Sequence, residues 1–157
     1  MPIPKKLLKF LDKNKVKYEM MQHRTVYTAY DKAKTLRVPD KIVGKTLVLK
    51  TNKELAIILI PANKNLDKNK FRKIAKVKKA DFSSERLMKN KLKGVKVGAI
   101  PPFGILWKLK TFMDQSFFKQ PKIILNAGDY KCSIKISPAH LKKIIPDLTI
   151  GGVSKAR

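Results

Sequence analysis

The sequence is poor in the residues that build metal sites, disulfides and nucleophilic active sites. Its 157 residues include one cysteine, Cys132, and two histidines, His23 and His140. A lone cysteine excludes a disulfide within the chain and fits a reducing compartment. Neither histidine belongs to a nucleophile motif, and one cysteine with two histidines is too small a set for a zinc site. We therefore expect no metal, no cofactor and no classical catalytic triad.

Long apolar runs are also missing. The longest, residues 55–60, is far too short to cross a bilayer. Residues 1–6, Met-Pro-Ile-Pro-Lys-Lys, lack the apolar stretch of a signal peptide. The sequence therefore predicts a soluble, cytoplasmic protein that does not enter a membrane.

Acidic residues are scarce, since 11 Asp and Glu stand against 37 Lys and Arg, for a formal net charge of +26. A compact body with this charge repels itself unless it binds an anionic partner, and nucleic acid is the first candidate. The lysines at positions 5, 6, 9, 13, 15 and 17 would supply one end of such a surface. A coding bias toward lysine would instead produce only a solvated surface. Composition leaves both interpretations open.

The hydrophobic content of 43% is sufficient for one globular domain, which we expect to span residues 1–157. Helices are expected over residues 4–14, 28–37, 67–76, 83–92, 114–118 and 138–145, and strands over residues 16–23, 43–51, 54–61, 106–113, 122–126 and 131–137. Hairpins join most strands, and helices are inserted between groups of them. The fold class is therefore expected to be α+β, with helices around a mixed, largely antiparallel sheet.

Two segments could carry chemistry. Gly44-Lys45-Thr46 has the ending of a phosphate-binding P-loop, but Pro39 replaces the required first glycine and a strand follows in place of a helix. Lys45 instead begins a strand, where it could point into a cleft or extend along the surface into solvent. Residues 98–104, Gly-Ala-Ile-Pro-Pro-Phe-Gly, form a stiff loop that is not helical. Its backbone amides could stabilise an oxyanion, or the loop could simply connect two strands.

Several short segments occur in a fixed order between about residues 16 and 146. They are His23 with Thr28, residues 43–50 (VGKTLVLK), 59–63 (LIPAN), 78–80 (KKA), 83–85 (SSE) and 98–104 (GAIPPFG), Asp114 with Phe117, and residues 126–128 (NAG) and 136–138 (ISP). Taken together they resemble the YbaK-type family, the editing domain associated with prolyl-tRNA synthetase. No single segment is specific, and the resemblance rests on their occurrence in register.

The resemblance implies a sheet around a cleft and metal-independent hydrolysis of the ester that joins an amino acid to the terminal ribose of tRNA. Lys45 matches the lysine with the central role, and Gly98, the other expected catalytic residue, matches the first position of the family's Gly-x-x-x-Pro loop around the aminoacyl group. The remaining matches to substrate-binding positions are His23, Thr28, Ala99, Ile100, Pro101, Pro102, Phe103, Gly104, Asn126 and Gly128. The implied partners are the aminoacylated 3′ end of tRNA and prolyl-tRNA synthetase, and the family's known targets include alanine and cysteine attached to the tRNA for proline.

The physical hypothesis is that Lys45 anchors the terminal adenosine and its phosphate, while amides of the Gly98 loop polarise the ester carbonyl. The ribose hydroxyl of the substrate would orient the attacking water. Two other classes of function stay open on the residues alone. One is a non-catalytic RNA-binding protein of the same fold, and the other is a regulator that binds a small ligand in the same cleft.

Overall fold

The computed structural model of the protein describes residues 4–157. Its helices are α1 Lys5–Lys13, α2 Ala29–Leu36, α3 Lys68–Ala75, α4 Glu85–Lys91 and α5 Pro138–Ile144. Its strands are β1 Glu19–Gln22, β2 Gly44–Thr51, β3 Leu55–Pro61, β4 Lys64–Leu66, β5 Ala80–Phe82, β6 Thr111–Asp114, β7 Ile123–Asn126, β8 Cys132–Ile136, β9 Thr149–Gly151 and β10 Ser154–Ala156.

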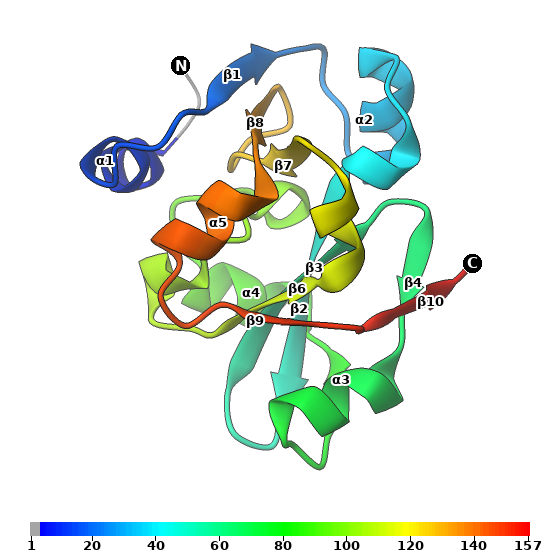
Figure 1. The fold of residues 1–157 in the computed structure, drawn as a ribbon. Helices are drawn as coiled ribbons and strands as arrows, with labels where there is room; N and C mark the ends of the chain where they lie inside the picture. Colours follow the sequence, from blue (N-terminus) through cyan, green and yellow to red (C-terminus); the bar gives the residue numbers. More distant parts are fainter. Residues whose placement is uncertain (1–3) are drawn as a thin grey trace.

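The strands form three sheets (Figure 1). The largest has the order β5-β2-β3-β6-β9, in which β5, β2 and β3 are antiparallel and β6 runs parallel to both β3 and β9. The sheet β1-β8-β7 and the pair β10-β4 are antiparallel. A parallel bridge from Val43 to Ile124 brings β7 beside the start of β2. The α+β class with mixed sheets, predicted from the sequence, is confirmed.

The strand β3 is the centre of the hydrophobic core and is buried at all seven positions. On one face, Ile58 and Ile60 pack with Phe71 of α3. On the other, Leu59 joins a cluster that includes Leu7 of α1 and Leu141 of α5. A strand that is covered on both faces carries apolar residues at successive positions, which accounts for the unbroken run at residues 55–60.

Side-chain caps mark most of the helix starts described within residues 4–157. The hydroxyl of Thr28 accepts the amide of Asp31, 3.0 Å away, at the start of α2. Asp67, Ser84 and Ser137 cap α3, α4 and α5 in the same way, and each accepts the amide three residues later. A cap satisfies one of the amides that the first helical turn leaves unpaired. These local signals positioned four of the five described helices.

The buried carboxylate of Asp114 fastens the C-terminal segment to the large sheet. Its Oδ1 accepts the amides of Val153 and Ser154, at 3.0 and 3.1 Å, and its Oδ2 accepts the amide of Ser116. Burial raises the pKa of Asp114, but these hydrogen bonds together lower it by more than burial raises it. The net pKa therefore lies below the usual range. Beyond this attachment, the guanidinium of Arg157 donates to the carbonyl of Ala62 at 3.3 Å.

Two expectations for the middle of the chain were wrong in detail. The strand expected over residues 106–113 comprises only Thr111–Asp114, and Gly104–Trp107 is a 3₁₀ turn. The chain doubles back there, because the amide of Leu109 donates to the Gly104 carbonyl at 2.9 Å. The backbone of Leu109 lies so close that there is no room for a side chain at Gly104. The loop expected to be free of helix also contains a single 3₁₀ turn, Val97–Ala99.

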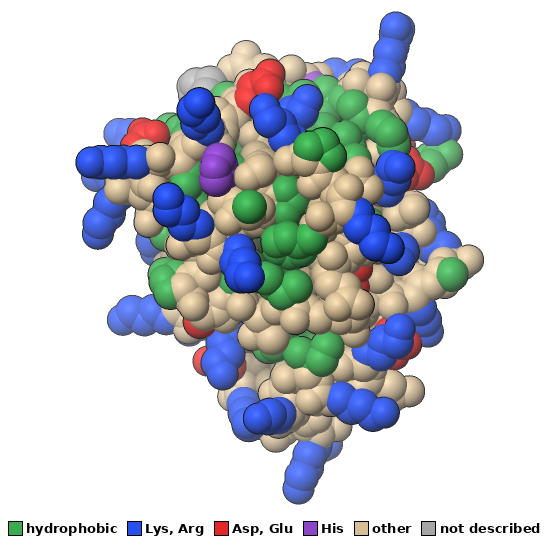
Figure 2. Space-filling model, in the orientation of Figure 1, with side chains coloured by type: hydrophobic (Ala, Val, Ile, Leu, Met, Phe, Trp, Pro, Cys, Tyr) green, Lys and Arg blue, Asp and Glu red, His purple; other side chains and the backbone are tan. Residues whose placement is uncertain are grey.

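None of the helices described within residues 4–157 is long and apolar enough to cross a membrane. Lys and Arg side chains are spread over the whole displayed face of the molecule, with few acidic groups between them (Figure 2). The charge on that face is thus a general positive field that would attract a polyanion from many directions.

Candidate functional site

The Gly98 loop and the Asn126–Gly128 turn are joined along their length. The amide of Lys96 donates to the Gly128 carbonyl at 3.0 Å, and the amide of Gly128 donates to the Ala99 carbonyl at 2.8 Å. The side-chain amide of Asn126 donates to the Ile100 carbonyl at 3.3 Å. Two segments almost 30 residues apart in sequence therefore form one continuous wall.

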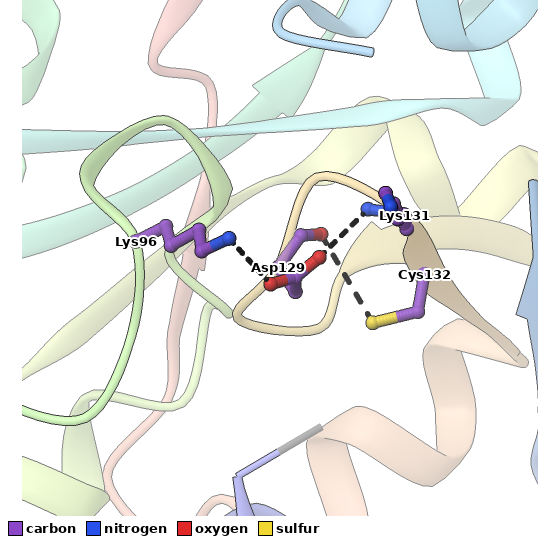
Figure 3. A network of polar contacts seen from close by, with 4 residues as sticks. All are labelled: Lys96, Asp129, Lys131 and Cys132. Carbon is purple, nitrogen blue, oxygen red and sulfur yellow. Dashed lines mark hydrogen bonds and ion pairs between the residues drawn. The ribbon is translucent and has the colours of Figure 1, made fainter. Parts of the chain in front are cut away.

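An ion pair reinforces this wall at one end (Figure 3). The ammonium of Lys96 lies 2.9 Å from Oδ2 of Asp129, whose Oδ1 accepts the amide of Lys131 at 3.0 Å. Burial raises the pKa of Asp129, but the hydrogen bonds to this carboxylate and the charge of Lys96 together lower it by more. The net pKa is therefore below the usual value. The carboxylate is therefore ionised at neutral pH and holds the two segments together.

Glycine is required at two positions of the wall. Gly128 has a φ of 96°, and a β-carbon there would lie 2.8 Å from the ring of Pro4. A β-carbon at Gly98 would lie 2.9 Å from the ring of Tyr130. The Gly98 loop can approach the turn this closely only because neither position carries a side chain.

The amides available in the loop are few. Those of Ala99 and Phe103 donate to carbonyls within or next to the loop, and that of Gly104 donates to the Thr111 hydroxyl at 2.9 Å. Pro101 and Pro102 have no amide hydrogen. Any oxyanion donor of this loop would have to be Gly98 or Ile100, and Gly98 is the exposed one of the two.

The second half of the loop supports the first half from the core. The chain from Pro101 to Gly104 is buried. Phe103 has no exposed surface, and its ring meets that of Phe10 edge-on, with 5.7 Å between centroids. These residues hold the loop in place, and the exposed surface of the segment belongs to Gly98.

Lys45 lies in β2, at the level of Asn126 in β7. Val43 and Ile124 stand two residues before Lys45 and Asn126 respectively, so the alternation of side chains along a strand is expected to direct Lys45 and Asn126 to the same side. Burial lowers the pKa of the Lys45 ammonium, and the positive charge of Arg157 lowers it further. Two cations within electrostatic reach of each other, one of them half-buried, favour the arrival of an anion.

The structure places His23 and Thr28 differently from each other. The ring of His23 is partly buried, with Nε2 2.9 Å from the hydroxyl of Ser133, which pairs across the sheet with Asn126. Burial lowers the pKa of His23, and the nearby charge of Lys32 lowers it further. Thr28 is exposed and already engaged as the cap of α2. His23 therefore adjoins the wall, whereas Thr28 positions the helix next to it.

Sequence reasoning missed Lys32. This side chain is 4% exposed, and its ammonium donates to Oδ1 of Asn126 at 2.6 Å. One signal could have found it, because Ala29, Lys32, Ala33 and Leu36 have the spacing of one helix face, and all but the lysine are small or apolar. A lysine at such a position must be buried or must break the face.

A separate hollow of about 50 Å³ lies at the far end of the large sheet. Residues from β3 and α3 line it, among them Leu55, Phe71 and Ala75. Its volume admits water but no nucleoside, and it includes neither Lys45 nor the Gly98 loop.

Comparisons with known proteins agree with this architecture. One solved structure, titled as the hypothetical protein APE2540, is 19% identical, with a TM-score of 0.86 over 96% of this chain and 100% of that one. A scaffold protein from an epitope-grafting design has a TM-score of 0.85 at 16% identity, covering 98% and 97% of the two chains. A proposed trans-editing enzyme for prolyl tRNA synthetase has a TM-score of 0.83 at 15% identity, covering 96% of each chain. At these identities the likeness establishes the fold.

The sequence comparison is more specific. No protein with a curated description matches the chain. Residues 23–144, which include the wall, Lys45 and Lys32, match the family described as the aminoacyl-tRNA editing domain. The chain belongs to the aminoacyl-tRNA editing domain family.

Proposed function

We propose that the protein is a free-standing trans-editing hydrolase that removes wrongly attached amino acids from tRNA. The observation that carries this proposal is the joined wall of the Gly98 loop and the Asn126–Gly128 turn, with Lys45 at the same level on the neighbouring strand. An exposed glycine in a rigid loop and a partly buried cation are groups that suit an ester carried on a phosphate backbone.

The residues would divide the work as follows. Lys45, with Arg157 nearby, attracts the phosphate and terminal adenosine of the tRNA. The exposed amide of Gly98 polarises the ester carbonyl as the negative charge develops on its oxygen. Water adds to that carbonyl, the ester C–O bond breaks, and the ribose hydroxyl and the free amino acid leave. An aminoacyl ester is already reactive, so positioning supplies most of the required rate.

We propose alanine or cysteine on the tRNA for proline as the substrate. The family resemblance supports this choice, as does the fold shared with the proposed trans-editing enzyme for prolyl tRNA synthetase. The selection would be steric, because a small hollow admits a side chain smaller than that of the correct amino acid and rejects larger ones. The aminoacylated 3′ end of tRNA is then the partner, with prolyl-tRNA synthetase as a second.

The test is to incubate the protein with a panel of mischarged tRNAs and to measure the amino acid released. Lys45→Ala should reduce the rate by at least about 10-fold, equivalent to ~1.4 kcal/mol of transition-state stabilisation. Lys50→Ala is the matched control, because Lys50 lies on the same strand and is exposed. A Lys45→Ala rate within about threefold of wild type would remove the assigned role.

The same assay separates the two other functions. An RNA-binding protein without activity would bind tRNA tightly and release no amino acid from any member of the panel. A ligand-binding regulator would gain thermal stability with a small amino acid or an aminoacyl-adenosine analogue and would likewise release nothing.

A further inference from the structure

Lys32 is the least exposed ammonium among the residues that the structure describes. It lies on the inner face of α2, and the aliphatic neighbours of this face include Ala33, Val43 and Ile124. Its ammonium donates a hydrogen bond to an amide oxygen, and the ion pairs found within residues 4–157 involve other lysines. A cation buried without a carboxylate is unfavourable for folding, so its presence calls for another explanation.

The hydrogen bonds around Asn126 give that explanation a geometry. Its Oδ1 accepts from the Lys32 ammonium at 2.6 Å, and its Nδ2 donates to the Ile100 carbonyl at 3.3 Å. A lysine ammonium can only donate and a backbone carbonyl can only accept, so the two contacts allow one orientation of the amide. Lys32, Asn126 and Ile100 thus form a chain of contacts from α2 to the Gly98 loop.

We propose that Lys32 is a positioning residue of the editing site, which fixes the orientation of the Asn126 amide and through it the Gly98 loop. This inference rests on the proposed function in one respect only, namely that the loop it positions acts on the ester. Without the ammonium, the Asn126 amide can rotate. The loop then loses the hydrogen bond from Asn126 to the Ile100 carbonyl, which lies two residues after Gly98.

The experiment compares Lys32→Met, Lys32→Gln and the control Lys34→Met with the wild-type chain. Methionine keeps an unbranched apolar side chain and removes the donor, whereas glutamine keeps a neutral donor. Lys34 lies two residues further along the same helix and is exposed. The measurements are kcat and KM for the mischarged tRNA, the melting temperature, and hydrogen exchange of the amides in residues 96–104.

We expect Lys32→Met to lower kcat by at least about 10-fold while KM changes less than about twofold. Exchange in residues 96–104 should accelerate, and the melting temperature should not fall, because a buried unpaired cation has been removed. Lys32→Gln should recover most of the lost kcat, and Lys34→Met should match the wild type. If Lys32→Gln is as impaired as Lys32→Met, the charge acts directly and the positioning role is overturned.

The failure of this inference can be told apart from the failure of the proposed function. An active wild type, with Lys32→Met at full kcat and unchanged exchange, overturns the positioning role and leaves the editing function intact. A wild type that releases no amino acid, with faster exchange in Lys32→Met, overturns the editing function and supports the positioning role. Should Lys32→Met fail to fold, Lys32→Gln carries the exchange measurement alone, and unchanged kcat and exchange there overturn the inference.

Discussion

Two lysines contact neighbouring residues of one segment, Asp129 and Asn126, in opposite electrostatic settings. Lys96 contacts the carboxylate of Asp129 while about half of its side chain stays in solvent. The hydrogen bond and charge of Asp129 raise the pKa of Lys96. Lys32 contacts the amide of Asn126 and is buried, and desolvation lowers its pKa to about 8. The surroundings of Lys96 therefore stabilise its charged ammonium, whereas the surroundings of Lys32 destabilise the charged form of that lysine.

The difference shows which contact serves the fold and which serves the site. A partly solvated ion pair of a lysine and an aspartate is a common way to fasten a turn and has little energetic penalty. A buried lysine held only by an amide is destabilising unless another advantage compensates for it. The four substitutions below test this division, beginning with the one expected to have the largest effect.

Gly128→Ala should disrupt the turn that lies between the contacts of Lys32 with Asn126 and of Lys96 with Asp129. Its φ of 96° is unfavourable for alanine, and the new methyl group would meet Pro4 at 2.8 Å. We expect a loss of about 2–3 kcal/mol in the free energy of unfolding, measured by denaturant titration. Gly94→Ala is a useful control, because its φ of 91° is similar but nothing lies within 4 Å. Equal losses in the two variants would show that the packing against Pro4 contributes nothing.

Lys32→Met should leave the unfolding free energy at pH 7 unchanged or raise it by up to about 2 kcal/mol. The folded pKa of about 8 lies below the ordinary 10.5. The unfolded chain therefore keeps its proton in a range where the folded one has lost it, and the wild type gains stability between about pH 8 and 10.5. The free energy of unfolding of the wild type should therefore rise relative to that of Lys32→Met over that pH range. A difference independent of pH would contradict the lowered pKa.

Asp129→Asn should cost roughly 0.5–1 kcal/mol at pH 7, because it removes the ion pair but keeps an acceptor for the Lys131 amide. The folded pKa of Asp129 is depressed, so its contribution is present above the unfolded pKa of about 3.8 and is lost as pH falls through the folded pKa. The wild type and the variant should therefore converge in acid. Asp81→Asn, which removes an exposed pair 3.8 Å long, should have no measurable effect at any pH.

Lys96→Met should have the smallest effect, less than that of Asp129→Asn. The carboxylate of Asp129 keeps the Lys131 amide as a donor, and the half-exposed lysine buries little surface. Thermal unfolding in low and high salt is the appropriate measurement, since screening should reduce what remains of the difference. If Lys96→Met is more destabilising than Asp129→Asn, the largely buried carboxylate of Asp129 depends on the charge of Lys96, and the assignment of Lys96 as the smallest contributor is wrong.

Local signals in the sequence predicted much of the fold. The helices expected to start at residues 28, 67, 83 and 138 begin within two residues of those positions, and the strands expected over residues 43–51 and 54–61 pair as a hairpin. Caps and turns depend on a few neighbouring residues, so the sequence contains the whole of their cause. The order of the short segments between residues 16 and 146 also indicated the family, which the family match over residues 23–144 confirms.

Other features depend on contacts between distant parts of the chain. The three-residue strands β4, β5, β9 and β10 were not predicted, because each exists only where a partner strand supplies its hydrogen bonds. Lys32 was missed for a similar reason, since its partner Asn126 is 94 positions away. The individual site residues other than Lys45 and Gly98 were carried by resemblance, and their roles stay predictions.

Both ends of the described chain touch the candidate site. Pro4 packs against Gly128, and Arg157 lies within electrostatic reach of Lys45. An affinity tag fused at either end would therefore lie beside the candidate site, so the activity assays call for untagged protein. A label for binding or fluorescence work is better inserted at the hairpin turn of Asn52 and Lys53, at the opposite end of β2.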